Sequence, residues 1–512
     1  MAQQVQKGEA WGTQNVVVEG GLYLDKDVLY QAMQMPGSAR SLVNYEPSLD
    51  GGYHRINGYG LYDTNQLPNG ASQVYGAIVN TVDGSVIAMQ SGNTYRSVGS
   101  GWTKINGADT HTSMGKVQWT FYAWATNRFA FVDGDPNAYP VRIEASGAYT
   151  VLSSAPKGQK FICEFSKYLW MSSGDGNVTF SAPGDDTNYS AINGAGQINV
   201  GFPIVGLGVW RGALYVFGTS RISQITGTSS ADWQLTTLTT NIGMIGPYTL
   251  QEVNGDLVFL SSDGLRTISG TARVFDRELG VITRPINTLV IPMGANNWCS
   301  VAIRTKSQYR MFQAVSTTDA GTAPGIIGAL KLQSNGSVAW EWSTTSGIKA
   351  SCASSGLVNG NELIIHAAWD GYVYKHDYGT DFNGTAIQSV YKTPHLVYND
   401  PGIRKILYKL CLNTRASGPT SINLGVSYDY LVSGVAQPVD QTLVVSGGGG
   451  AYDSGITYDQ TPIIYYDVYP DDRVCTNLIG SGFTSSFTFT SNGGNDFSIQ
   501  AFSIQYGEGT RR

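Results

Sequence analysis

The chain of 512 residues contains 63 glycines and 30 tyrosines, with 14% charged and 42% hydrophobic residues. Its glycine share of about 12% exceeds the roughly 7% of an average protein. The glycines follow no triplet period, which excludes collagen, and the even spread of apolar residues excludes wholesale disorder. The net charge is −6, and no more than two basic residues are adjacent, which argues against a protein that binds nucleic acid tightly.

The cysteines and the amino terminus indicate a soluble product made in a reducing cytoplasm. The cysteines are odd in number, far apart and without a Cys-x-x-Cys pair: Cys163, Cys299, Cys352, Cys411 and Cys475. We therefore expect small buried apolar side chains, and neither a disulfide framework nor a zinc site. The polar start Met-Ala-Gln-Gln shows no signal peptide, and no apolar run reaches the roughly 18 residues of a membrane span.

The segment 1–59 is predicted to form a lead-in outside the repeats that follow. A short strand is expected over Val16–Val18. The only plausible helical stretch is Asp25–Met35, which ends at Pro36.

A unit of apolar strand, polar turn and second strand then recurs through the middle of the chain. Its matching points are Ile87, Phe129, Leu169, Leu214, Leu257, Tyr309 and Leu363. Successive points are spaced at close to the period of a propeller blade, in which four short strands use about 40 to 50 residues. The last two spacings are slightly longer than the others. The repeat therefore predicts a β-propeller.

The predicted fold class is all-β, with a propeller of six or seven blades over residues 60–393. Blades bury both faces of their sheets, which explains the apolar composition, and their turns explain the glycine excess. Asp263-Gly264 and Asp370-Gly371 suit hairpin turns that need a positive φ.

After Pro394 the period is lost, and residues 394–512 are predicted to form a β-sandwich-like domain. Strands are expected near Ile403–Leu412, Ser421–Tyr430 and Ser485–Thr490. The tract Ser446–Gly450, one serine and four glycines, is predicted to be a flexible loop.

The chain lacks the common catalytic signatures, and no catalytic, metal-binding or cofactor-binding residue is predicted. It has no His-Glu-x-x-His and no Gly-x-Ser-x-Gly, and Met114–Val117 lacks the upstream Gly and the Ser or Thr of a phosphate loop. Of the five histidines, His54, His111, His366, His376 and His395, only His366 and His376 are close in sequence. A structural or surface role is favoured for this pair over metal binding.

Acidic residues in turns are a separate case because some propellers are glycosidases or sialidases. The candidates are Asp133, Asp135, Asp175, Asp185, Asp186 and Asp263. Aspartate in turns normally accepts backbone N–H bonds, and we favour that role here. The stretch from Asp133 to Asn137 resembles half of a calcium loop, without the glycine and distal glutamate that would complete it.

Aromatic side chains could also stack on sugars or bases. The candidates are Tyr95, Trp102, Trp119, Tyr122 and Trp124. Their alternating positions in predicted strands favour packing in the core or between subunits.

Short motifs near both ends and in the middle of the chain resemble one known family. In the segment Pro36–Asp63, a small-residue turn precedes a Leu-x-Asn strand and a Gly-Gly-Tyr-x-Arg-Ile-x-Gly-Tyr motif. The matching residues are Leu42, Asn44, Gly51, Gly52, Tyr53, Arg55, Ile56, Gly58, Tyr59, Tyr62 and Asp63. The Asp-Gly-x-Arg turn at Asp263–Arg266, the stretch Asn296–Phe312, the SYDY at Ser427–Tyr430 and the terminal Ile504–Arg512 also fit. Together they resemble the tail nozzle proteins of short-tailed bacteriophages, also called tail hub or packaged-DNA stabilisation proteins.

This resemblance implies a structural virion protein and not an enzyme. The family forms a hexamer below the portal and adaptor rings, made in the host cytoplasm and built into the tail. It extends the channel for DNA ejection, helps to retain packaged DNA, and docks tail fibres, tailspikes, a tail needle or a plug. No cofactor is implied, and the matching Gly, Tyr and Arg residues are interpreted as turn and packing residues.

Two other hypotheses come from different classes. A propeller glycan hydrolase or lectin acting in adsorption to the host surface would need clustered carboxylates in a central funnel. A secreted carbohydrate-binding module is disfavoured because no signal peptide is visible.

Overall fold

The computed structural model describes residues 11–49, 51–273, 280–294, 298–313, 324–332, 336–398, 400–431, 435–446 and 471–511. The four glycines of the loop predicted at Ser446–Gly450 lie outside the described residues. The chain divides into two compact units. One comprises residues 60–326 and 347–377, and the other comprises residues 1–59, 327–346 and 378–512. Within the described residues, no helix combines the length and apolar character that a bilayer crossing requires.

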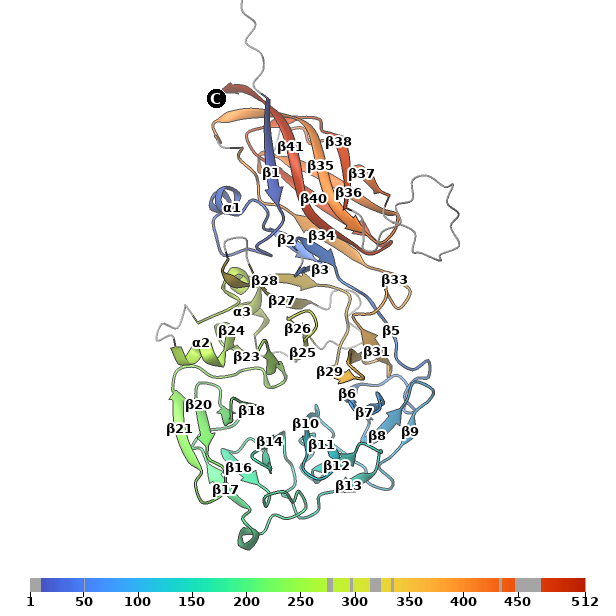
Figure 1. Cartoon of the computed structure of the whole chain (residues 1–512), viewed down its shortest axis with the longest axis vertical. Helices are drawn as coiled ribbons and strands as arrows, with labels where there is room; N and C mark the ends of the chain where they lie inside the picture. The colour runs from blue at the N-terminus through green and yellow to red at the C-terminus, as the bar shows by residue number, and fades with distance from the viewer. Residues whose placement is uncertain are drawn as a thin grey trace, which may run out of the picture. The chain divides into compact units, whose positions relative to one another are not determined.

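The unit of residues 60–326 and 347–377 is a β-propeller, as predicted (Figure 1). The first two blades consist of β6 (Val74–Val79), β7 (Val86–Gln90), β8 (Asn93–Ser97) and β9 (Thr103–Lys104), then β10 (Gln118–Ala123), β11 (Asn127–Val132), β12 (Val141–Glu144) and β13 (Tyr149–Val151). The next two consist of β14 (Phe161–Phe165), β15 (Tyr168–Ser172), β16 (Asn177–Phe180) and β17 (Gly196–Asn199), then β18 (Gly206–Trp210), β19 (Ala213–Phe217), β20 (Ile222–Thr226) and β21 (Gln234–Thr239).

The remaining blades are less regular. A three-stranded sheet contains β22 (Gln251–Val253), β23 (Asp256–Ser261) and β24 (Gly264–Thr267). A hairpin of β25 (Trp298–Ile303) and β26 (Gln308–Gln313) follows. The last blade contains β29 (Cys352–Val358), β30 (Asn361–Ala367), β31 (Val373–His376) and β5 (Tyr59–Leu61). Six sheets and one hairpin thus occupy the ring, in agreement with the predicted six or seven blades.

The sequence repeat coincides with the blades. Each matching point of the repeat lies in the second strand of its blade: β7, β11, β15, β19, β23, β26 and β30. Two insertions lengthen the period near the end of the ring. The helices α2 (Ile268–Arg273) and α3 (Asn287–Met293) precede β25, and residues 327–346, which group with the other compact unit, precede β29.

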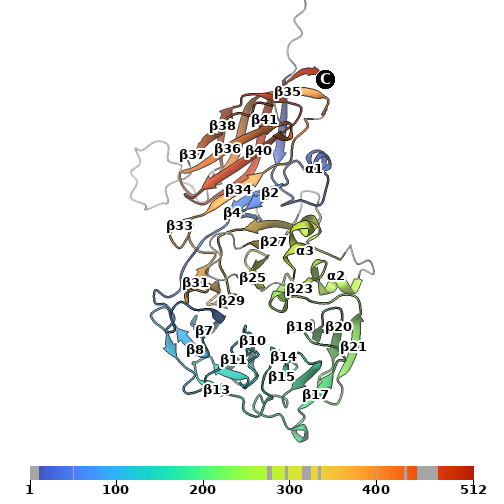
Figure 2. The same cartoon turned by 180° about the vertical axis from the view of Figure 1, so that it is seen from behind.

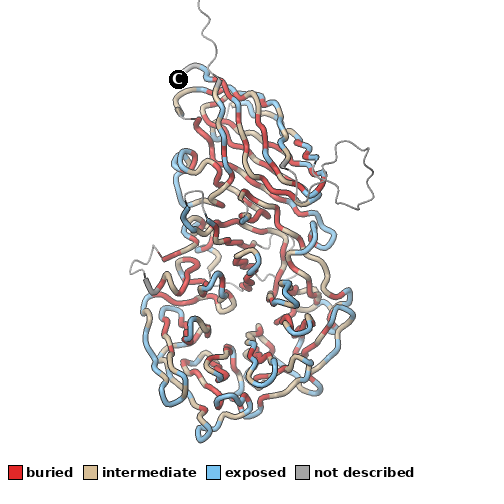
Figure 3. The backbone as a smooth tube through the Cα atoms, in the orientation of Figure 1, coloured by how far each residue is buried: buried red, intermediate tan, exposed pale blue. Residues whose placement is uncertain are grey.

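Apolar contacts between successive blades form the core of the propeller. All five residues of β7, of β15 and of β19, each the second strand of its blade, are buried, and Figure 3 shows buried stretches throughout the propeller. One cluster joins Ile87 and Met89 of the first blade to Phe129 of the second. Another joins Val79 of the first blade to Ile365 of the last, and so closes the ring.

The strand β5 also closes the ring, because it precedes the first blade in sequence but is a strand of the last blade. The amide of Tyr62, directly after β5, donates to the carbonyl of Val373 at 2.9 Å. Figure 2 shows the same circular order of strands from behind.

The other unit contains two packed β-sheets. One sheet has the order β3 (Tyr45–Pro47), β4 (Tyr53–Arg55), β41 (Phe497–Arg511), β35 (Ile403–Ala416) and β38 (Asp471–Asn477), with β1 (Trp11–Val17) beside β41 and β39 (Ser481–Gly482) beside β35. The other includes β28 (Val338–Thr345), β2 (Ser41–Val43), β34 (Gln388–Lys392), β40 (Ser485–Asn492), β36 (Thr420–Tyr428) and β37 (Gln441–Val445). This unit also contains β27 (Gly325–Leu332) from Ile327 on, and the short strands β32 (Asp381–Phe382) and β33 (Thr385–Ala386).

Aromatic side chains fill the space between these sheets. The ring of Phe502 lies 5.9 Å from that of Phe487 and 5.6 Å from that of Phe489. Tyr53 and Tyr391 meet edge to face at 5.1 Å. The predicted β-sandwich is therefore present.

The compact unit that contains this sandwich also includes chain outside residues 394–512. It takes in described residues of the segment 1–59, the stretch from Ile327 to Ser346 and residues 378–393. The reason is strand pairing: β2 pairs with both β28 and β34, and β34 pairs with β40. Pairing over such sequence distances leaves no periodic signal in the sequence.

The helix α1 (Val28–Gln34) lies within the predicted stretch. The carboxylate of Asp27 caps it by accepting from the amides of Leu29 and Tyr30 at 2.9 and 3.4 Å. The helix ends before Pro36, which cannot supply a backbone donor. The described residues also contain short 3₁₀ turns at Ala191–Asn193, Pro247–Thr249, Arg284–Ile286 and Asp429–Leu431.

The prediction that the chain has no disulfide is wrong. Cys411 of β35 faces Cys475 of β38 in the antiparallel register, and the two sulfurs are bonded. Their Cα atoms are 4.0 Å apart. The pairing of two strands that are distant in sequence creates this proximity, so the spacing of the cysteines gave no sign of it. Cys163, Cys299 and Cys352 are buried free thiols, as expected.

Candidate functional site at the propeller centre

A cavity of about 230 Å³ lies where the inner strands of several blades converge. Residues from β6, β10, β22, β25 and β29 line it, together with the segments that lead into β10 and β22. Each of these five strands is the first of its blade or hairpin. The propeller topology therefore gathers side chains from distant parts of the sequence into one pocket.

Lys116 is the central cation of this pocket. Its Nζ donates to the carbonyl of Trp298 at 2.5 Å and lies 4.8 Å from the ring centroid of Tyr248. Burial lowers the pKa of Lys116 from its ordinary value, and the nearby thiols of Cys299 and Cys352 oppose this shift. The ammonium group is thus partly desolvated.

The same residues bridge the centre of the ring. The hydroxyl of Tyr248 donates to the carbonyl of Lys116 at 3.1 Å, and the side-chain Nε2 of Gln118 donates to the carbonyl of Pro247 at 3.3 Å. These bonds join the segment before the second blade to the segment before the fifth. They therefore tie together parts of the ring that are far apart in sequence.

Two free thiols form part of the pocket wall. Burial raises the pKa of Cys299 to about 11 and that of Cys352 to about 12. Both are therefore neutral at pH 7 and act as apolar, uncharged surface. A nucleophilic cysteine needs a lowered pKa, so neither thiol fits that role.

The turn aspartates lie outside this pocket and perform the predicted turn chemistry. Asp133, Asp135, Asp175 and Asp185 each accept from the backbone amide two residues further on, at 2.9 to 3.1 Å. Burial acts to raise the pKa of Asp135, but amide donors including Ser113 and Asn137 outweigh it, so this pKa lies below its usual value. These carboxylates are held as acceptors within their own turns.

Two of the aspartates pair with arginine instead. Asp263 accepts from Nε and Nη2 of the buried Arg266 at 3.0 and 2.8 Å. Asp186 accepts from Arg142 at 2.8 Å and from Arg128 at 3.3 Å. Both carboxylates therefore have structural partners.

The half calcium loop at Asp133 is occupied by other partners. Oδ2 of Asp133 lies 2.6 Å from Nδ1 of the buried His111. Burial acts to lower the pKa of His111, but Asp133 and Asp109 outweigh it and raise this pKa. Within the described residues, no three His, Cys, Asp or Glu side chains are grouped to hold a metal ion.

The structure brings His366 and His376 together, although not as a metal site. Their Nδ1 atoms are 3.2 Å apart, and Nη1 of Arg310 lies 3.0 Å from Nε2 of His376. Burial lowers the pKa of His366 to about 3 and that of His376 well below its ordinary value. Both imidazoles are neutral members of the propeller core.

The predicted aromatic candidates separate into two groups. Tyr95 and Tyr122 are buried, which fits the expected packing role. Trp102 packs beside Tyr62, and Trp124 lies 4.7 Å from Tyr122. Trp119 differs because it lines the central pocket.

Four pocket residues, Lys116, Tyr248, Arg304 and Ser354, are not identifiable as such from the sequence. In the sequence, Lys116 stands only in an incomplete phosphate loop. The local signal of its position is that Lys116 shortly precedes a strand with alternating apolar and polar residues, β10.

No protein-family profile and no curated protein matches the chain. Solved structures share only the general fold at low similarity. A crystal structure of BBS1N in complex with ARL6DN has a TM-score of 0.37 and 8% identity, covering 63% of this chain and 97% of that one. The computationally designed Ika8 protein has a TM-score of 0.34 and 9% identity, with coverages of 61% and 98%. The extracellular domain of the putative hybrid two component system BT4673 from B. thetaiotaomicron has a TM-score of 0.39 and 8% identity, with coverages of 62% and 39%. Similarity at this level carries no information about function.

Proposed function

We propose that the chain is a non-enzymatic structural protein of a virion, the hexameric tail nozzle of a short-tailed bacteriophage. The observation that supports this proposal is that motifs from both ends of the chain, which resemble those of the family, lie in the same sheet. The motif strand β4 pairs with β41, which contains residues 504–511 of the terminal motif, through Tyr53 with Ile499 and His54 with Ser498. Motifs from opposite ends of the chain thus belong to one sheet.

The matching residues in these motifs have packing and turn roles, as the resemblance implies. Nη2 of Arg55, a fully buried residue, donates to the carbonyl of Gly494 at 2.9 Å. A Cβ on Gly52 would lie 2.2 Å from the carbonyl oxygen of Ile499. Asn44 donates to the carbonyls of Ser346 and Gln388 and accepts from the amide of Ser346.

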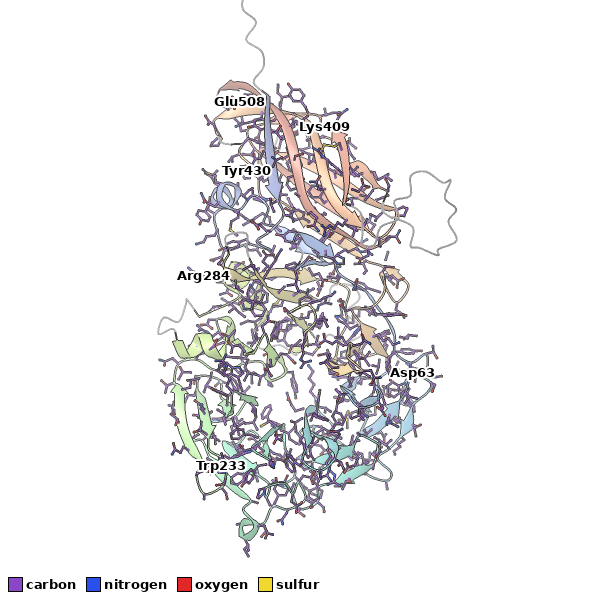
Figure 4. The ribbon with its side chains drawn as sticks, in the orientation of Figure 1. Asp63, Trp233, Arg284, Lys409, Tyr430 and Glu508 are labelled. Atoms are coloured by element: carbon purple, nitrogen blue, oxygen red, sulfur yellow. A yellow bond between two sulfur atoms is a disulfide. The ribbon has the colours of Figure 1, made fainter. Side chains whose placement is uncertain are left out.

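The motif continues into the propeller with the same kind of role. Asp63 accepts from the amides of Asn65 and Gly101 at 2.9 and 2.6 Å, and its position is shown in Figure 4. The bidentate pair of Arg266 with Asp263 fixes the Asp-Gly-x-Arg turn. These roles support a family whose shared residues maintain a scaffold and perform no chemistry.

In this proposal, six copies form a ring below the adaptor and continue the channel through which DNA leaves. The propeller centre is no DNA conduit, because its cavity measures about 230 Å³ and is bridged by Lys116 and Tyr248. The DNA channel is the lumen enclosed by the six subunits. A hexamer would carry a net charge of −36, six times −6, and would repel the DNA phosphates. Its outer surfaces dock fibres, tailspikes, a needle or a plug.

The test is assembly with the upstream ring. The purified chain is mixed with the adaptor ring and imaged by electron microscopy, with the chain alone and the adaptor alone as controls. The proposal expects a sixfold ring of this chain on the adaptor. A stable monomer that never joins complexes of portal and adaptor would refute it.

The glycan hydrolase alternative is not favoured by the propeller centre. Hydrolysis by the common mechanism needs two carboxyl groups about 5 to 10 Å apart. None of the described residues that line the central cavity is an aspartate or a glutamate.

A further inference from the structure

The central cavity of the propeller is positively charged, in contrast to the chain as a whole. Lys116 and Arg304 line it, and none of its described lining residues is acidic. The chain contains 38 acidic and 32 basic residues, so a cavity with only cations departs from its overall balance. Such a site favours an anion over a neutral molecule.

Lys116 is the cation whose charge is least compensated. Among the described residues, no carboxylate lies within ion-pair distance of its Nζ, whose partners are a carbonyl and an aromatic ring. Arg304 is different, because its Nη1 lies 3.7 Å from Oε1 of Glu362 and donates to Ser355. A partly buried charge without a counter-ion is unfavourable, and a bound carboxylate would relieve part of that cost.

One polar group in the wall lacks a hydrogen-bond partner in the part of the chain that the structure describes. The hydroxyl of Ser354 is buried without a hydrogen bond there, and the residue is only 6% exposed. Ser354 lies on β29 and lines the same cavity as Lys116. Buried hydroxyls are normally hydrogen-bonded, so this orphan group points to a missing ligand.

The remaining wall combines aromatic rings with amides. Tyr75, Trp119 and Tyr248 supply aromatic surface, on which the apolar face of a sugar ring can pack. Gln118 and Gln251 each use their NH₂ group on a backbone carbonyl, at 3.3 and 3.1 Å. Their amide oxygens are acceptors that suit sugar hydroxyls.

We propose that the propeller centre binds a small acidic sugar, a monosaccharide unit with one carboxylate. The carboxylate is bound by Lys116 and Ser354, and the ring packs against the aromatic wall. The volume of about 230 Å³ is below the roughly 300 to 1,000 Å³ of pockets for drug-sized ligands, so a single ring is the appropriate size. This site is independent of the proposed assembly role, since it lies within one propeller.

The test is calorimetric titration of the full chain with D-glucuronate and D-galacturonate, using D-glucose as the neutral comparison. At least one uronate is expected to bind about tenfold or more tightly than glucose, because a charge-assisted bond adds to the shared ring contacts. A uronate-terminated oligosaccharide then shows whether the source is a free sugar or the end of a polysaccharide. Tighter binding of either form supports the site.

The variant Lys116→Met removes the charge and keeps most of the side-chain length. It is expected to abolish the preference for uronate. Lys157→Met is the matched control, because Lys157 also lies over a tyrosine ring, that of Tyr139 at 4.6 Å, but does not line the cavity. It should bind like the unmodified chain.

Ser354→Ala provides a second variant if Lys116→Met does not fold, and should weaken uronate binding without affecting glucose. The inference is overturned if neither uronate binds at concentrations up to about 20 mM. It is also overturned if glucose binds equally well, or if a folded Lys116→Met variant retains the uronate preference.

Discussion

Burial keeps the two histidines of the propeller core neutral, and neighbouring cations add to this effect at His376. His366 stacks on Tyr374 at 5.1 Å, and His376 meets Phe312 edge to face at 5.3 Å. Asp377 accepts from Arg310 at 2.9 Å and pairs with Lys306 at 2.7 Å. Burial acts to raise the pKa of Asp377, but these two cations outweigh it and hold the pKa far below its usual value. A proton on His376 would face this cationic environment, and a proton on His366 would be buried without solvent.

We therefore predict that acid destabilises the propeller partly through His366. Its pKa of about 3 lies below the ordinary value of 6.5, so the unfolded chain takes up the proton first as the pH falls. The neutral His366 therefore makes its full contribution to the free energy of unfolding above pH 6.5. Below that pH, the contribution decreases by about 1.4 kcal/mol per pH unit. In His366→Phe this part of the decrease should be missing, which urea unfolding at several pH values between 7.5 and 5 would measure.

The control for this prediction is Tyr374→Phe. This change removes the bond from the Tyr374 hydroxyl to Asp370 at 2.6 Å but no titrating group in that pH range. Its free energy of unfolding should decrease equally at both ends of the pH range. Parallel pH profiles for the unmodified chain and His366→Phe would contradict the assigned role.

At the scale of single turns, Gly371 is essential for closing the ring. It has a φ of +76°, and a Cβ added there would lie 2.1 Å from the carbonyl oxygen of Gly70. The same loop is held by the bond from the amide of Leu67 to the carbonyl of Gly371 at 2.9 Å. The turn thus links the segment before the first blade to the last blade.

Gly371→Ala is predicted to lower the free energy of unfolding far more than Gly255→Ala. Gly255 has a similar φ of +73° but has open space where a Cβ would be added. Its replacement should cost only the conformational penalty, about 1 to 2 kcal/mol. The backbone clash at Gly371 should add about 2 kcal/mol or more, which chemical denaturation can resolve. Equal losses would show that the loop relaxes freely.

At the scale of strands, the bond between Cys411 and Cys475 cross-links β35 and β38. Reducing it is predicted to lower the stability of the sandwich unit by about 2 to 4 kcal/mol. Thermal unfolding with and without a reductant measures this loss. A variant with both cysteines changed to alanine should be unaffected by the reductant.

A thiol count provides an independent measurement of the same bond. The denatured but unreduced chain should expose three free thiols, those of Cys163, Cys299 and Cys352, and the reduced chain should expose all five. Five reactive thiols before reduction would show that the disulfide does not form.

At the scale of the whole molecule, the net charge of −6 predicts no retention of duplex DNA. DNA binding depends on clustered cations, and its affinity decreases steeply with salt. A gel-shift experiment at about 150 mM salt should show free DNA with the chain, in contrast to a basic DNA-binding domain of similar size. Tight, salt-sensitive binding would contradict a passive channel wall.

The propeller was predictable because each blade repeats the same local pattern. Ile87, Phe129 and Leu169, for example, lie on equivalent second strands in successive blades. The turns at Gly264 and Gly371 have the expected positive φ. The period lengthens between β26 and β29, because residues 327–346 stand between these two strands and group with the other compact unit.

The sequence by itself determined the all-β class, the repeated blade and the absence of a strongly cationic composition, because these depend on local alternation, turn residues and total charge. Only the tertiary structure decided which distant strands pair. It therefore decided that the amino-terminal segment joins the sandwich, that Cys411 bonds Cys475, and that Lys116, Trp119 and Ser354 share a cavity. Each depends on long-range contacts, which no local pattern in the chain encodes.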